Sequence, residues 1–269
     1  MNILITTIET APFSHVGGLA RGTYSLAKAL SNVSHSVRII TPFHSFVEDL
    51  KCNNSQFNWG KSKNLKVPLN ETGENRHLQS CLVEECLPQP GQPHTFFINK
   101  PDYFSLRSRV YGYDDDYKRF YYFSLATLEW LLSLKKNHDW QPHIIQTHDW
   151  HTGYLVELLK REKRFKQLAN IPILFTVHNF KYQHEIKFQY MGANETDSGT
   201  TKLATINSKE LSEQNSLLRG LLYSDQINTV SPTHAREVSD AEYSLNLSET
   251  ISKVKQKLTG ILNGLDYHD

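Results

Sequence analysis

The first thirty residues constrain the fold most strongly, because a short apolar segment leads through a pair of glycines into an amphipathic segment. Residues 3–5 are typical of a strand buried on both faces, and apolar side chains recur at helical spacing from residue 19 to residue 30. Gly17 and Gly18 lie in the turn between them. Adjacent glycines let a ligand approach the backbone, and the free N–H groups at a helix start favour an anion. The turn is therefore a candidate phosphate site; a tight turn with positive φ angles is the alternative interpretation.

The segments that follow predict an α/β fold built on a parallel sheet. A strand at residues 36–41 completes a β-α-β unit with the first strand and helix, and such units have right-handed crossovers. Residues 44–99 alternate in short polar and apolar runs, which indicates an antiparallel, β-rich insertion at one edge. The clearest helix is at residues 114–136, and further strands are predicted at 143–147, 171–177 and 226–230. We therefore expect one Rossmann-like domain over residues 1–269, with helices on both faces of the sheet.

Charge and cysteine content exclude several classes of partner. The 269 residues carry a formal net charge of +1, whereas duplex DNA and anionic membranes require a concentrated basic surface. We expect neither nucleic acid nor membrane as a partner. The three cysteines form neither a paired framework nor a metal-binding spacing, and no apolar run is long enough for a signal peptide or a membrane span. The composition therefore favours a cytoplasmic protein without disulfides.

Polar and histidine-rich segments follow four of the predicted strands. The turn at residues 15–18 follows the first strand, and the later segments are His148-Asp149-Trp150-His151, His178-Asn179 and Ser231-Pro232. In an open parallel sheet, ligands bind outside the carboxyl ends of the strands. We therefore expect these four loops to converge on one rim of the sheet and to form a binding site there.

Metal-ion sites are weighed against simpler interpretations at two places. His148 and His151 have zinc-binding side chains, but no cysteine or third histidine has a suitable spacing, and Asp149 is expected to cap the following helix. Asp114 and Asp116 form an Asp-x-Asp pair of the kind that holds a divalent cation against a diphosphate, although acidic residues are also ordinary at a helix start. We expect no metal ion and no cofactor.

Five sequence blocks, taken in order, resemble one family across nearly the whole chain. Residues 9–30 include Glu9, A-P-F, V-G-G-L and A-K-A-L, and the later blocks read H-D-W-H-T-G (148–153), T-V-H-N with Y-Q (176–183), T-V-S-P-T (229–233) and G-I-L-N-G-L-D-Y (260–267). These blocks resemble the amino-terminal catalytic domain of bacterial glycogen synthases and plant starch synthases. Tyr111-Gly112, Arg119-Phe120 and Glu129 add to the resemblance.

The resemblance implies a glucosyltransferase. That family transfers glucose from ADP-glucose or UDP-glucose, with retention of configuration, to the non-reducing end of an α-1,4-glucan. It uses two Rossmann-like domains, the arrangement called GT-B. This chain resembles only the amino-terminal one, so we expect the nucleotide-binding second domain to be absent or separately encoded, and little turnover by this half alone.

The resemblance also implies roles for individual residues. His178 would stabilise the positive charge that develops at the anomeric carbon, Glu9 and Asp149 would be the other catalytic residues, and Gly17 and Gly18 would offer amides to the distal phosphate. The further residues expected to bind substrate are His15, Arg21, His151, Asn179, Gln183, Ser231 and Asn263.

Four positions depart from the family pattern and keep a second interpretation open. His15 replaces a lysine and Arg21 replaces an aspartate, both beside the glycine turn. Because histidine carries a charge only part of the time at neutral pH, phosphate stabilisation would be weaker. Phe104-Ser105-Leu106 replaces an aromatic-Asp-Arg acceptor contact, and His234 replaces a tyrosine. The alternative function is a catalytically degenerate domain that binds a glucan or a partner without transferring glucose.

Overall fold

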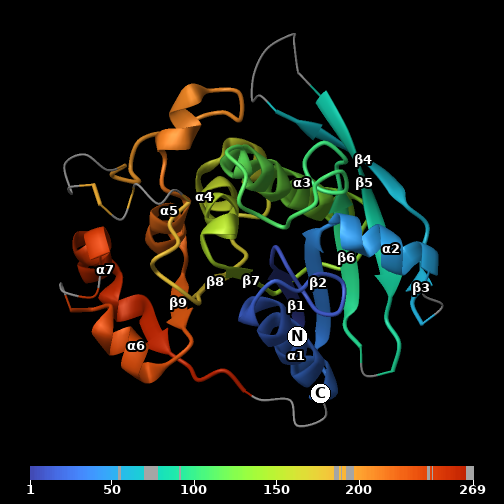
Figure 1. Ribbon diagram of the computed structural model, residues 1–269, viewed down its shortest axis with the longest axis horizontal. Helices are drawn as coiled ribbons and strands as arrows, with labels where there is room; N and C mark the ends of the chain where they lie inside the picture. The colour runs from blue at the N-terminus through green and yellow to red at the C-terminus, as the bar shows by residue number, and fades with distance from the viewer. Residues whose placement is uncertain are drawn as a thin grey trace. The chain divides into compact units, whose positions relative to one another are not determined.

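The computed structural model describes residues 1–53, 56–69, 78–90, 92–184, 188, 190–191, 197–240, 243 and 245–264 (Figure 1). The chain divides into two compact units. Unit 1 comprises Met1–Asp114, Leu125–Ile145 and Gly264–Asp269, and unit 2 comprises Asp115–Ser124 and Gln146–Asn263. Both units combine strands with helices, which confirms the α/β class.

Unit 1 contains a mixed sheet whose strands follow the order β1-β2-β6-β5-β3, with β4 also paired to β5. The parallel part consists of β1 (Asn2–Thr6), β2 (Ser36–Pro42) and β6 (His94–Asn99). The antiparallel part consists of β3 (Asn58–Trp59), β4 (Lys63–Pro68) and β5 (Leu78–Leu87). The predicted β-α-β unit and the antiparallel insertion are therefore both confirmed.

Helices cover both faces of the unit 1 sheet. Helix α1 (Gly18–Asn32) contributes Ala27 to a core cluster with Ile3, Ile5, Val37 and Ile39 of the first two strands. On the same face, α2 (Ser45–Asn53) contributes Val47 to a second cluster with Phe13, Phe43, Cys86 and Phe97. The unit 1 part of α3 (Asp116–Lys136) packs on the opposite face, where the rings of Trp130 and Phe96 are 4.8 Å apart. The apolar surface buried on both faces is the main force that holds this layer structure together.

Unit 2 contains parallel strands in the order β10-β9-β8-β7. They are β7 (Ile144–His148, of which the last three residues belong to this unit), β8 (Ile173–Val177), β9 (Gln226–Thr229) and β10 (Leu258–Gly260). The helices are α4 (Gly153–Arg161), α5 (Ser216–Tyr223), α6 (Pro232–Glu237) and α7 (Ser248–Val254). Short 3-10 helices span Trp150–Thr152, Lys163–Phe165, Lys209–Glu213, Leu245–Leu247 and Lys255–Lys257.

A glycine determines how closely α4 and α5 approach. A Cβ added at Gly153 would lie 1.9 Å from the carbonyl oxygen of Ser216, which is far closer than any side chain allows. The Ser216 hydroxyl also donates to the Trp150 carbonyl oxygen (2.5 Å) and accepts from the Tyr154 N–H (3.1 Å). The start of α4 is therefore fixed directly against the start of α5.

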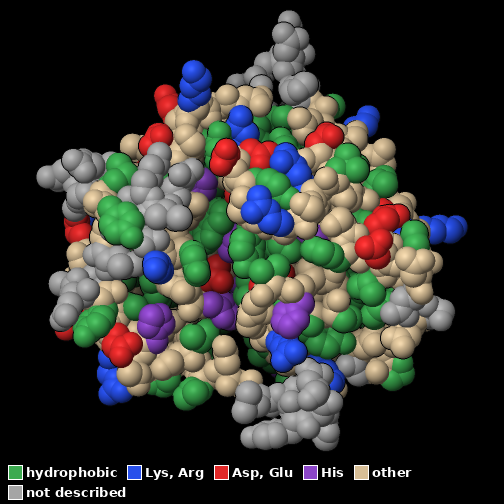
Figure 2. Space-filling view, viewed as in Figure 1, with side chains coloured by type: hydrophobic (Ala, Val, Ile, Leu, Met, Phe, Trp, Pro, Cys, Tyr) green, Lys and Arg blue, Asp and Glu red, His purple; other side chains and the backbone are tan. Residues whose placement is uncertain are grey.

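Charged side chains of both signs are interspersed on the visible surface (Figure 2), in agreement with the net charge of +1. Across the part of the chain that the structure describes, no helix is both long and apolar enough to span a membrane.

Candidate active site

The glycine turn of unit 1 is organised by a buried carboxylate. Glu9 is 2% exposed, and its Oε2 accepts hydrogen bonds from the N–H groups of Val16 (2.6 Å) and Gly17 (3.4 Å). Thr23 of α1 donates to the Glu9 carbonyl oxygen (3.3 Å), so the loop is anchored to the helix that it precedes. Glu9 thus shapes the turn from within.

The tight-turn interpretation of the two glycines is wrong. The glycines with positive φ in the described part of the chain are Gly112 and Gly199, and Gly17 is extended with φ −142°. A Cβ added at Gly17 would make only an ordinary contact, 3.7 Å from Glu9 Oε1, and one added at Gly18 would meet no atom within 4 Å. Neither backbone strain nor packing within the described chain therefore requires glycine here.

Two basic residues flank this turn without partners among the described residues. His15 and Arg21 are exposed, and neither forms a hydrogen bond or an ion pair with the residues that the structure describes. No acidic residue lies in the first turn of α1, where the positive end of the helix dipole lies. The start of α1 is therefore an exposed, electropositive element.

The histidine-rich loops of unit 2 form a compact polar cluster. His148 ends β7, and its Nδ1 lies 3.1 Å from Nε2 of His178, which follows β8. Asp149 Oδ1 accepts the N–H of His178 (2.7 Å), and the Asp149 N–H donates to the Thr176 carbonyl oxygen (2.9 Å). Asp149 adopts this position with φ +56°, a conformation that non-glycine residues rarely adopt and that clusters at functional sites.

Burial determines the protonation of this cluster. It lowers the pKa of His148 well below its usual value, and the nearby His178 lowers it further, so the His148 ring is neutral at neutral pH. Burial raises the pKa of Asp149, although His178 and the N–H groups of His178 and Asn179 act in the opposite direction. The cluster therefore combines a neutral imidazole with a carboxyl group whose ionisation is held back by burial.

The expected capping role of Asp149 is wrong. Asp149 precedes the 3-10 helix at Trp150–Thr152, but its side chain makes no capping hydrogen bond. The carboxylate instead bonds to the loop after the neighbouring strand, as described above. The sequence pattern placed His148 in a polar loop and among possible zinc ligands, but not beside His178. Their contact depends on how β7 and β8 align, and nothing in the local sequence reveals that alignment.

The other predicted residues of unit 2 have different surroundings. His151 is 7% exposed and its ring packs against the rings of Trp150 (4.0 Å) and Phe120 (4.9 Å). Ser231 caps α6 by accepting the N–H groups of Thr233 and His234. Asn179 is exposed and its Oδ1 accepts the N–H of Lys181 (2.9 Å), while Asn263 is exposed near the end of the described chain.

Gln183 belongs to a buried polar network. It is 1% exposed, its Nε2 donates to Asn246 Oδ1 (3.0 Å), and its Oε1 accepts from Asn215 Nδ2 (2.9 Å). The Asn215 N–H in turn donates to Asp197 Oδ2 (3.0 Å). Both ends of the Gln183 amide are thus occupied by protein groups.

A buried arginine completes this network. Arg219 is fully buried, and its Nε and Nη2 donate to the two carboxylate oxygens of Asp197 (2.8 and 2.9 Å). Its Nη1 donates to Glu157 of α4. These bonds tie the segment that follows the His178 loop to both α4 and α5.

Neither of the two metal patterns weighed above forms a ligand set among the described residues. Asp116 forms an ion pair with Arg119, one helical turn away, and the His148 ring contacts that of His178. Among the described residues, no group of three or more His, Cys, Asp or Glu side chains is arranged to hold a metal ion.

Parallel strands whose carboxyl ends carry polar loops are typical of one class: the chain is a Rossmann-like α/β protein. Comparison with known families matches residues 2–253 to the starch synthase catalytic domain. The chain belongs to that family.

Relatives and a solved structure agree with this assignment. The chain is 32% identical over 272 residues to the glycogen synthase of Clostridium novyi (strain NT) and 34% identical over 275 residues to that of Caldicellulosiruptor bescii. Each alignment covers 99% of this chain and 52% of the relative. The catalytic domain of starch synthase IV from Arabidopsis thaliana, bound to ADP and acarbose, superposes with a TM-score of 0.75 at 27% identity, covering 99% of this chain and 52% of that one. The chain thus spans about half the length of the curated relatives it matches.

Proposed function

We propose that residues 1–269 are the amino-terminal domain of a retaining glucosyltransferase. The donor is ADP-glucose or UDP-glucose, and the acceptor is the non-reducing end of an α-1,4-glucan. A second GT-B domain, on the same or a separate chain, completes the enzyme and holds most of the nucleotide. Family membership and the glycogen synthase relatives support this proposal. A cytoplasmic location agrees with the absence of disulfide bonds among the described cysteines.

The observation that carries the proposal is the arrangement of His148, Asp149 and His178. Transfer with retention passes through a state with positive charge at the anomeric carbon, and preorganised dipoles stabilise such charge without having to reorganise. The Asp149 carboxylate holds the main chain of His178 at 2.7 Å, and His148 contacts the ring of His178 at 3.1 Å. Because His148 is neutral, it adds no repulsive positive charge beside the reacting sugar.

The glycine turn has the properties that the proposal requires for a diphosphate. The space around Gly18 is open, so an oxygen of the leaving nucleotide has access to the backbone at the start of α1. Arg21 supplies a cationic side chain that no described residue neutralises, and His15 supplies an exposed imidazole beside it. We therefore assign the phosphate side of the reaction to this turn, with Arg21 compensating in part for the missing lysine at position 15.

A degenerate binding domain is not favoured. Loss of catalysis would remove the reason to keep Asp149 buried at a positive φ angle, because that conformation costs stability. The departures at His15 and Arg21 lie in the exposed turn and leave the buried cluster complete.

The proposal is tested by measuring transfer of labelled glucose to a maltooligosaccharide, with the chain joined to the second domain of a glycogen synthase relative. Transfer from ADP-glucose or UDP-glucose is expected, and His178→Ala should lower kcat by about 10²- to 10³-fold. The matched control is His35→Ala, which changes a histidine immediately before β2 and outside the cluster, and it should leave kcat unchanged. Glucan binding without any transfer would identify the degenerate domain instead.

A further inference from the structure

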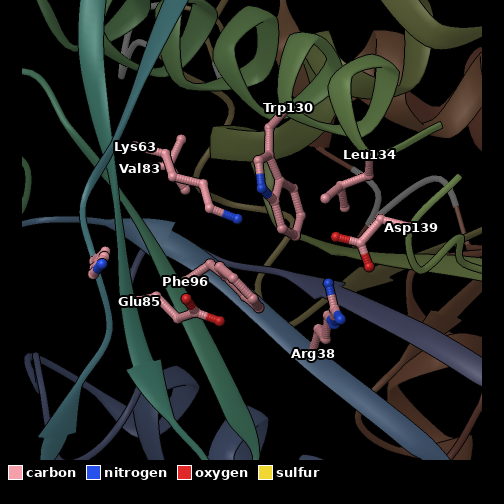
Figure 3. A pocket seen from close by; sticks show the side chains of 9 residues that line it. Arg38, Lys63, Val83, Glu85, Phe96, Trp130, Leu134 and Asp139 are labelled. Carbon is pink, nitrogen blue, oxygen red and sulfur yellow. The ribbon is translucent and has the colours of Figure 1, made fainter. Parts of the chain in front are cut away.

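A small cavity in unit 1 lies apart from the residues assigned above. It has a volume of about 50 Å³ and opens on the sheet face that α3 covers (Figure 3). Strand register explains its lining, because Arg38 pairs with His94, Phe96 with Glu85, and Lys63 with Val83. Trp130 and Leu134 of α3 close the cavity on the helix side.

Arg38 is held in place but makes no hydrogen bond. Its guanidinium carbon lies 4.5 Å from the ring centroid of Trp140 and 5.1 Å from that of Phe96. The side chain is half-buried, yet it has neither a hydrogen bond nor an ion pair closer than 4 Å with the residues that the structure describes. Contact with two aromatic rings does not satisfy the five N–H donors of a guanidinium. Those donors therefore need oxygen acceptors from outside the described chain.

Two lysines line the same cavity. Figure 3 shows the Lys63 side chain reaching toward the space between Phe96 and Trp130. Lys61 also lines the cavity, and neither lysine has an ion-pair partner within the described residues. The strand position explains the direction of Lys63, because it shares its face of β4 with the buried Leu65 and Val67.

The carboxylates at the cavity already have hydrogen-bond partners. Glu85 Oε1 lies 2.8 Å from His94 Nε2, and Asp139 Oδ1 accepts the N–H of Trp140 (2.6 Å). Both attract Arg38 at longer range. Three cations against two carboxylates leave the lining with one excess positive charge.

We propose that this cavity binds a phosphate-sized oxyanion. The planar guanidinium group of Arg38 provides one cation, and Lys63 provides the second. The N–H groups of a guanidinium match the spacing of phosphate oxygens, and charge-assisted hydrogen bonds of this kind are stronger than neutral ones. A volume of about 50 Å³ accommodates one such group or a few waters but does not enclose a sugar ring. The ligand is therefore inorganic phosphate or the phosphate group of a monoester whose remainder stays outside.

The test uses the full chain labelled with ¹⁵N at arginine, titrated with inorganic phosphate at constant ionic strength. The Nε–Hε signal of Arg38 should shift and saturate. Lys63→Gln should weaken binding by about tenfold, the effect of losing one charge-assisted hydrogen bond. Lys66→Gln is the matched control, because Lys66 is an exposed lysine on the opposite face of the same strand, and it should leave the dissociation constant unchanged.

Further arms separate the possible sources of the signal. Glycerol 3-phosphate binding as tightly as inorganic phosphate identifies the phosphate group alone as the ligand, and tighter binding identifies a monoester. Arg38→Lys, which keeps the charge but removes the guanidinium group, should also weaken phosphate binding. This binding is measured from the shifts of backbone amides around the cavity. Gly18→Ala should leave the Arg38 shift unchanged, which keeps this result independent of the glucosyltransferase proposal. A shift that does not saturate, or an equal loss in Lys63→Gln and Lys66→Gln, would overturn the proposed site.

Discussion

The glycine turn of unit 1 and the histidine cluster of unit 2 are built in opposite ways. In the cluster, the side chains of His148 and Asp149 are buried and bonded to His178. In the turn, His15, Gly18 and Arg21 are exposed and make no contact that would require their identity. The cluster is preorganised by the fold, whereas under the proposed function a ligand completes the turn. Substitutions in the cluster should therefore change both stability and activity. Substitutions in the turn should change activity alone.

The largest effect is expected for Asp149→Asn in the two-domain enzyme. Asparagine can still accept the His178 N–H but lacks the negative charge, so kcat should fall by about 10²-fold. The stability of the folded variant should instead rise at neutral pH. Because burial raises the pKa of Asp149, the folded state loses stability as pH rises above the unfolded pKa of this carboxyl.

At neutral pH the variant should therefore unfold at a higher temperature than the wild type. The difference should vanish at about pH 3, where the Asp149 carboxyl is uncharged in both the folded and the unfolded state. Asparagine has nearly the same shape as aspartate, so the unusual backbone conformation at position 149 (φ +56°, ψ 179°) should be kept. Calorimetry across this pH range provides the measurement. A variant that is both slower and less stable at neutral pH would show that the carboxylate mainly supports the fold.

Gly18→Ala tests the other side of the comparison. A Cβ at this position meets no atom within 4 Å, and alanine favours helix, so stability should stay constant or rise by up to about 1 kcal/mol. Binding of ADP to the two-domain enzyme should weaken by about tenfold, because the Cβ occupies space that a phosphate needs. Gly153→Ala is the contrasting control, since its Cβ would collide with Ser216, and it should destabilise by about 3 kcal/mol or more. Unchanged ADP affinity in Gly18→Ala would remove the phosphate role from the turn.

His148→Gln should change how stability depends on pH. Burial lowers the pKa of His148, so its contribution to stability is complete above the unfolded histidine pKa and is lost as pH falls through the folded one. Between about pH 7 and pH 5 the wild type should therefore lose stability, and the variant should lose less. His15→Gln, which changes an exposed histidine, should retain the wild-type pH dependence. Equal curves for the wild type and His148→Gln would mean that the His148 ring is not neutral in the folded protein.

The smallest effect is expected for His15→Lys, which restores the family residue. A full positive charge beside the bound diphosphate should strengthen ADP binding by about two- to fivefold at low salt, the range of an exposed ion pair. The melting temperature should hardly change. Isothermal titration at two salt concentrations measures the gain, which should shrink as salt screens the charge. Weaker ADP binding would indicate that the imidazole contributes a specific hydrogen bond.

Much of the fold could be predicted from the sequence, because the central strands are apolar on both faces and glycine and proline mark the turns between elements. The helix predicted at 114–136 is observed at Asp116–Lys136, and the strand predicted at 171–177 at Ile173–Val177. Helix α2 was missed because Val47 is its one buried hydrophobic residue, which leaves almost no periodic signal. Strand β10 has three residues, too few for any pattern.

The candidate site was predictable in its residues but not in its contacts. His148 and His178 are thirty positions apart in sequence, and only the alignment of two strands brings their rings to 3.1 Å. Burial of Gln183 depends on Asn215 and Asn246, which belong to distant segments. The convergence of the unit 1 turn with the unit 2 loops stays a prediction.

The buried Arg219 limits how this chain can change over evolutionary time. Its guanidinium is shared between Asp197 and Glu157, so loss of Arg219 leaves the buried Asp197 carboxylate without a cation, at a cost of about 3 to 5 kcal/mol. Such a step is comparable to the whole margin of stability of many domains. Arg219 is therefore expected to be inherited together with Asp197 among homologues, or to be replaced by an apolar residue only when Asp197 is replaced as well.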